Sequence, residues 1–139
     1  MATYVKFQKF VEDMAKGVHQ LHAAGHTLKA YLTNTAPNVS THTVKTDLAG
    51  ITEQHGYEPK DINNDFSRTG GVVTVTAVDI VLTATGGTFG PFQYVVVYND
   101  TPTSPIDPLI CYWNIGSETT CEIGDIFTID FGSSLFTME

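Results

Sequence analysis

Apolar and polar positions divide the chain into a short helical region and a long β region. In residues 4–16, apolar side chains recur every three or four positions, which places them on one face of an α-helix, and Gly17 ends the pattern. We therefore predict an amphipathic helix over residues 4–16, packed on the sheet or on a neighbouring subunit. Its apolar stripe includes Phe7, Phe10, Val11 and Met14.

Residues 90–100 predict the central strand of the fold. β-favouring residues run from Phe92 to Tyr98, interrupted only by Gln93, between a Gly-Pro entry and an Asn-Asp-Thr-Pro exit. Simple alternation puts Phe92, Tyr94, Val96 and Tyr98 on one face and Gln93, Val95 and Val97 on the other. Because both faces are largely apolar, the strand belongs in the middle of a sheet.

Further strands follow from the remaining alternation. Residues 27–33 predict the first strand, residues 72–77 and 79–84 predict two strands or one bent strand, and residues 125–131 alternate cleanly. Residues 109–114 and 117–122 predict a hairpin. We therefore predict one domain over residues 1–139 that is mainly β: an antiparallel β-sandwich or small barrel with one N-terminal amphipathic α-helix. Its β core comprises residues 27–33 and 72–138.

Residues 38–71 interrupt this regular pattern. The stretch is largely polar, with few apolar side chains to anchor it, and turn-forming residues break it repeatedly. A long irregular insertion in a small domain is typical of a functional loop or of an arm that meets a partner. Together with the helix, this arm predicts an interaction surface formed by Phe7, Phe10, Val11, Met14, Tyr57 and Phe66.

The two cysteines are placed by the predicted hairpin. If its turn is centred on Gly116, Cys111 and Cys121 lie directly opposite each other on antiparallel strands. Such a pair has Cα atoms about 4.5 Å apart, within reach of a disulfide. A reducing cytosol would keep both as buried thiols, whereas an oxidising medium would allow the bond to form. Both states stay open.

Composition and charge narrow the function classes. The net charge of −8 argues against autonomous nucleic-acid binding, which needs cations to neutralise phosphates. Charged residues make up only 16% of the chain, so uncharged polar residues cover much of the surface. The chain contains no apolar run long enough for a transmembrane helix, and its first residues lack the pattern of a secretory signal. We expect synthesis in a host cytoplasm and no membrane partner.

Candidate chemistry is sparse. The sequence contains no nucleophile elbow, no phosphate-binding loop and no Cys-x-x-Cys pair. His19, His22 and His26 would share a face if their segment were helical and could then bind zinc or nickel, but Gly17 and Gly25 disfavour that helix. Asp125 and Asp130 are better explained as outward positions of a strand than as an acid–base pair. We expect no enzymatic activity, no metal and no cofactor.

Several stretches resemble a family of small virion proteins of tailed bacteriophages. The likeness is carried by residues 10–13 (FVED), 32–37 (LTNTAP), 107–110 (DPLI), 127–132 (FTIDFG) and above all 90–101 (GPFQYVVVYNDT). It extends over nearly the whole chain, including the N-terminal helix. Other residues often stand in this family where Cys111 and Cys121 stand here.

The resemblance implies a component of the phage particle, and decoration of the outer head surface is the role we expect. The partners would then be the major capsid protein or other virion proteins and sister copies, for which a trimer is a natural closed arrangement. The location would be the virion, with the capsid surface favoured. A neck, tail or host-adhesion component remains the alternative.

Overall fold

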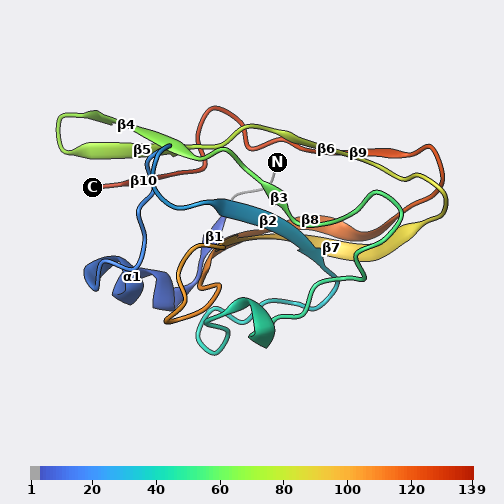
Figure 1. Cartoon of the computed structure of the whole chain (residues 1–139), viewed down its shortest axis with the longest axis horizontal. Helices are drawn as coiled ribbons and strands as arrows, with labels where there is room; N and C mark the ends of the chain where they lie inside the picture. The colour runs from blue at the N-terminus through green and yellow to red at the C-terminus, as the bar shows by residue number, and fades with distance from the viewer. Residues whose placement is uncertain (1–3) are drawn as a thin grey trace.

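Strand β7 (Phe89–Asn99) lies at the centre of a five-stranded antiparallel sheet in the computed structural model, which describes residues 4–139. Residues 95–98 are all buried, because both faces of this sheet are covered. The prediction of a central strand is therefore confirmed. The order across the sheet is β1 (Val5–Lys6), β8 (Leu109–Cys121), β7, β2 (Leu28–Thr33) and β3 (Lys60–Asp61), as Figure 1 shows.

Two smaller antiparallel sheets form a second layer over one face of the large sheet (Figure 1). One contains β10 (Phe136–Met138), β5 (Val72–Thr76) and β4 (Asp65–Thr69), in that order. The other pairs β6 (Ile80–Thr83) with β9 (Ile126–Ile129). This layered arrangement with one short helix agrees with the predicted mainly β, sandwich-like fold.

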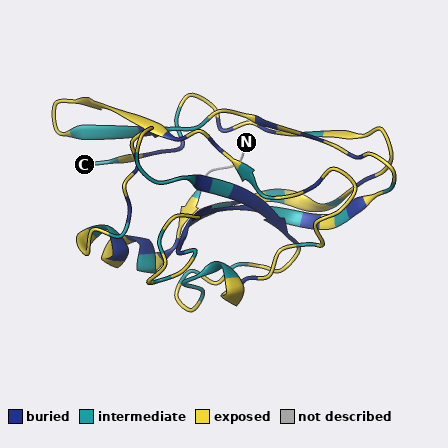
Figure 2. Cartoon of the chain, viewed as in Figure 1, coloured by how far each residue is buried: buried dark blue, intermediate teal, exposed yellow. Residues whose placement is uncertain are grey.

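The main core lies between the two layers. From β2 it receives Leu28, Ala30 and Leu32, the alternate positions that face inward in a strand. From the second layer, Leu82 and Ile129 point back toward them. Figure 2 shows this burial concentrated in the strands, with exposed residues in the loops and on the hairpin between β4 and β5. Each fully buried large aliphatic or aromatic side chain contributes roughly 1.5–3 kcal/mol.

A second core covers the opposite face of the large sheet. Within residues 38–59, which include one 3₁₀ turn (η1, Lys45–Asp47), Val39 and Leu48 pack there with Tyr31, Val96 and Tyr98. The Tyr31 hydroxyl donates to the carbonyl of Leu48 at 2.7 Å. The predicted irregular arm over residues 38–71 is therefore only partly correct: residues 38–59 are irregular apart from η1 but lie on the sheet, and the last part forms β3 and β4.

Helix α1 (Gln8–Ala15) is shorter than the predicted helix over residues 4–16, because β1 takes up Val5–Lys6 beside β8. The Phe7 N–H then donates to the carbonyl of Ile110 at 3.0 Å, which fixes the chain just before the helix. Gly17 adopts a φ of 74°, and the helix ends beside it as predicted. No helix within residues 4–139 is long and apolar enough to cross a membrane.

The predicted hairpin around Gly116 is wrong. Strand β8 continues through this position and pairs with β7 along its length, from Leu109 opposite Tyr98 to Cys121 opposite Phe89. The register shifts near Phe92, where extra residues of β8 oppose β7. Such bulges change which face a residue occupies. Phe92 consequently joins Val95 and Val97 in the main core, not Val96 as simple alternation predicted.

Candidate interaction surface

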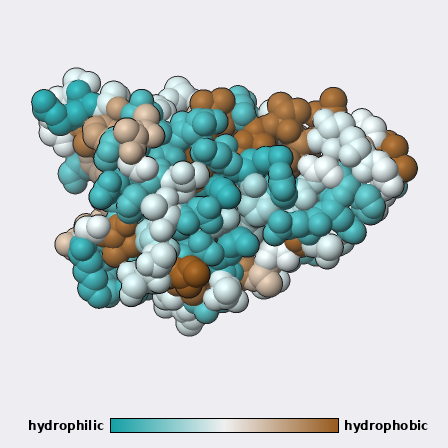
Figure 3. Space-filling view, viewed as in Figure 1, coloured by the Kyte–Doolittle hydropathy of each residue, from teal (hydrophilic) through white to brown (hydrophobic). Residues whose placement is uncertain are grey.

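The two layers separate at one end of the molecule, where α1 lies below the β4–β5 hairpin (Figure 1). The space between them is a groove made of two hollows of about 390 Å³ and 340 Å³, which share Met14 and Met138; the second hollow is lined mainly by apolar groups. The space-filling view is indented between the hairpin and the helix (Figure 3). We call this surface the end groove and define it by Val11, Met14, Phe66, Val73 and Met138.

Strand pairing explains the upper wall of the end groove. The register aligns Met138, Val73 and Arg68 in one cross-strand row. Two residues further along each strand, it aligns Phe136, Val75 and Phe66 in a second row. Directly paired residues share a face of the sheet, so both rows face α1. The row between them, on the opposite face, is polar. It consists of Thr137, Thr74 and Ser67.

The lower wall comes from α1. Val11 and Met14 are three residues apart and therefore lie on one side of the helix. Beneath them, Phe10 is buried and its ring centroid lies 5.5 Å from that of Phe136. Val11 remains 54% exposed and Phe66 42% exposed. The core is thus closed below the groove, and the apolar side chains above it face solvent.

The predicted interaction surface is only partly correct. The structure brings Val11, Met14 and Phe66 together in the end groove, although they come from distant parts of the sequence. Phe7, Phe10 and Tyr57 are instead buried, and their inclusion was wrong. The helix stripe has two parts, since its first aromatic residues enter the core. Sequence reasoning missed Val73 and Met138, whose place depends on strand pairing.

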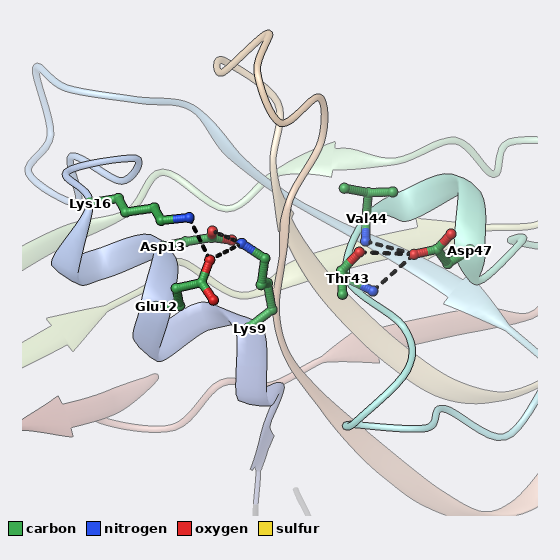
Figure 4. A network of polar contacts seen from close by, with 7 residues as sticks. All are labelled: Lys9, Glu12, Asp13, Lys16, Thr43, Val44 and Asp47. Carbon is green, nitrogen blue, oxygen red and sulfur yellow. Dashed lines mark hydrogen bonds and ion pairs between the residues drawn. The ribbon is translucent and has the colours of Figure 1, made fainter.

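Ion pairs hold the solvent side of α1 (Figure 4). Lys9 Nζ contacts Glu12 at 2.6 Å and Asp13 at 2.9 Å, and Lys16 Nζ contacts Glu12 at 2.7 Å. The hydrogen bonds from Lys16 and Lys9 lower the pKa of Glu12 to about 2.

Figure 4 also shows the Asp47 carboxylate, which accepts from the N–H groups of Thr43 and Val44. These bonds lower the pKa of Asp47 and fasten the loop over the second core.

A buried polar cluster lies beside the end groove. Asn99 Nδ2 lies 3.0 Å from Nδ1 of His19 and 2.9 Å from Nδ1 of His26. Asn99 Oδ1 accepts from the Thr101 N–H, so its Nδ2 must donate to both imidazoles. Both histidines therefore accept at Nδ1 and carry their proton on Nε2. Burial lowers the pKa of His19 to about 4.

A second exposed apolar surface lies at the other end of the molecule. On the β6–β9 sheet, Ile80 and Leu82 point inward, whereas Val81 is 61% exposed and Ile126 is 65% exposed. Ile123, in the turn before β9, is 69% exposed. Figure 3 shows a hydrophobic area over these strands. We call Val81, Ile123 and Ile126 the β6–β9 face. In the sequence, the signal for this face was the presence of apolar residues at outward positions.

Charge is distributed unevenly between the two ends. All seven Lys and Arg residues lie at or before position 68, the last of them being Arg68. The charged residues that flank Val81, Ile123 and Ile126 in the sequence are therefore all acidic. These are Asp79, Glu122, Asp125 and Asp130.

Two other hollows of similar size lie on the surface. One of about 430 Å³ lies beside Trp113 and the turn at residues 130–135. The other, of about 380 Å³, lies over Tyr31, where Lys45 Nζ sits 5.3 Å from the ring centroid and forms a cation–π contact. The rings of Trp113 and Tyr31 are both buried, which leaves little aromatic surface for stacking on a ligand.

The predicted opposition of Cys111 and Cys121 is wrong, because both lie on the single strand β8. Ten residues of strand separate their Cα atoms by roughly 30 Å, far beyond the span of a disulfide. Both are free thiols in the buried interior. Burial raises the pKa of each thiol.

The candidate metal ligands do not converge. His19 and His26 direct Nδ1 at the Asn99 amide, and His22 is exposed at the surface. Across residues 4–139, no three His, Cys, Asp or Glu side chains are placed to share a metal ion.

Comparison with family models, curated proteins and solved structures finds no match to this chain.

Proposed function

We propose that this chain is a structural component of a tailed-bacteriophage particle and that it decorates the outer surface of the head. The end groove is the observation that carries the proposal. Its apolar side chains lie over a core that is already closed, so their exposure has no role in folding. Exposed apolar groups gathered on one face are typical of a surface that a partner covers.

The sequence resemblance supplies the kind of partner. Its main stretch, residues 90–101, coincides with the central strand β7 and the turn after it, and residues 107–110 lead into β8. The resemblance therefore covers the segments that build the large sheet. The acidic, weakly charged surface also suits a protein that must stay soluble at the high local concentration of a particle.

A neck, tail or host-adhesion component is the second candidate. The hollow beside Trp113 favours it, since aromatic and hydroxyl groups together can hold a sugar. Burial of the Trp113 ring weighs against this reading. The head is preferred because the end groove presents more exposed apolar surface than the hollow beside Trp113 does.

Particle localisation tests the proposal. Purified phage particles imaged by electron microscopy should show this chain in hundreds of copies on the head. A handful of copies at the neck or tail would favour the second candidate, and absence from the particle would refute both.

The end groove has its own test. Phe66→Ser should reduce recovery of the protein with purified heads. Ser67→Ala, on the opposite face of the same strand, should not.

A further inference from the structure

We propose that copies of this chain associate head to tail, with the β6–β9 face of one copy seated in the end groove of the next. The inference deepens the proposed function by naming a second copy of this chain as the partner that covers the end groove, so that head binding would depend on contacts between neighbouring copies; it rests on that function in one respect, namely that the chain works in many copies. Its evidence is the pair of unlike apolar surfaces at opposite ends of one molecule (Figures 1 and 3).

Shape favours pairing the two unlike surfaces. The end groove is a hollow between two walls, whereas Val81, Ile123 and Ile126 project into solvent from strands and a turn. Two grooves placed face to face would leave an unfilled space at their centre. Projecting Val and Ile side chains would instead fill the hollows and contact both walls.

Charge disfavours pairing the β6–β9 face with itself. Such a contact would bring two sets of Asp79, Glu122, Asp125 and Asp130 together without a cation between them. The margin of the end groove carries cations that can pair with these acids, beside the Glu139 carboxylate. Lys6 lines the groove, and Arg68 shares a cross-strand row with Val73. Within residues 4–139, neither Lys6 nor Arg68 takes part in an ion pair.

The two apolar surfaces are too small to form a stable interface by themselves. An exposed apolar patch of this kind covers a few hundred Å². A stable protein interface buries about 800 Å² on each partner, so the charged margins must be included in the contact. Because the two surfaces differ, each copy can use both at once. Such a heterologous contact gives a ring if the rotation between copies closes, or a filament if it does not.

Sedimentation of the purified full chain provides the first test. The wild-type protein should form species larger than a dimer at high micromolar concentration. Ile126→Ser should weaken association at least about tenfold, and Phe66→Ser should do the same. Both side chains are exposed, so circular dichroism should show folded protein in each case. Ser67→Ala, on the face of β4 that points away from the end groove, is the control.

Mixing the two variants tests the head-to-tail geometry. The Ile126→Ser protein keeps an intact end groove, and the Phe66→Ser protein keeps an intact β6–β9 face. Each variant alone should be monomeric, and an equimolar mixture should give a heterodimer that grows no further. Self-pairing of either surface predicts instead that only one variant loses association.

Two results would overturn the inference: a wild-type protein that stays monomeric throughout, or a mixture that forms no heterodimer. The proposed function fails separately, because it depends on where the protein is found in the particle. Head-to-tail oligomers of a protein missing from the particle would refute that function alone.

Discussion

Asn99 donates from its side-chain amide to Nδ1 of His19, 3.0 Å away and 80 residues earlier in the chain. This contact fixes the proton of His19 on Nε2 and joins the segment after α1 to the central strand. Nε2 is buried without a protein partner, as is Oδ2 of Asp13, whose negative charge opposes the effect of burial on the His19 pKa. Burial has the larger effect, and it makes this position sensitive to acid.

We expect acid to destabilise the fold through His19. Its pKa is about 4 when folded and near 6.5 when exposed, so only the unfolded chain gains this proton between these values. The free energy of unfolding therefore falls as pH drops from 6.5 toward 4, by up to about 1.4 kcal/mol per pH unit. Urea unfolding at several pH values measures the slope. His19→Gln should flatten it, whereas His22→Gln, at an exposed site, should not. Equal slopes for wild type and His19→Gln would contradict this assignment.

The Asn99 amide should be important for stability. Asn99→Ala removes two donors, one to the buried His19 imidazole and one to the half-buried His26 imidazole, and the acceptor for the Thr101 N–H. We expect a loss of about 2–4 kcal/mol in the free energy of unfolding, because buried groups lose their partners. Chemical denaturation provides the measurement. The control is Asn34→Ala, which removes one exposed contact to Glu118 and should cost less than about 0.5 kcal/mol.

Both cysteines should behave as protected thiols. A thiol reagent should modify neither Cys111 nor Cys121 in the native protein and both after unfolding, because burial hides them and raises their pKa values. Reductant should leave the melting temperature unchanged. A mass lower by about two hydrogens, restored on reduction, would instead reveal a disulfide and a different course for β8.

Truncation of two adjacent residues of β6 should change the free energy of unfolding by very different amounts. Leu82 is 2% exposed and faces the main core, so Leu82→Ala should cost about 2–5 kcal/mol. Val81 faces outward, and Val81→Ala should stay within about 0.5 kcal/mol of wild type in dilute solution. Thermal and chemical unfolding report both values. Similar losses at the two positions would place β6 elsewhere in the fold.

Gly56 should be sensitive to any side chain. It adopts a φ of 92°, and a Cβ there would overlap the carbonyl oxygen of Thr83. We expect Gly56→Ala to destabilise the protein by more than about 1 kcal/mol. Gly71→Ala provides the control, since a Cβ at that position meets no atom within 4 Å. A neutral Gly56→Ala variant would show that the loop can move away from β6.

The sequence by itself determined the fold class, the central strand and the strands β2 and β9. These features follow from local alternation, which needs only neighbouring residues. The end of α1 was equally local, since Gly17 takes the left-handed conformation there. Val11, Met14 and Phe66 were identified as apolar residues at exposed places, although nothing in the sequence indicated that they meet.

Only the tertiary structure decided the course of β8, the burial of Leu48 and Tyr57 and the composition of both exposed surfaces. Gly116 suggested a turn, but pairing with β7 kept the chain extended, because ladder hydrogen bonds and burial outweigh a local preference. Tyr57 looked exposed within a polar segment, yet its hydroxyl oxygen accepts the Leu32 N–H at 2.8 Å and its ring is buried in the core. Registers and layer contacts join residues far apart in sequence, and local patterns carry no record of them.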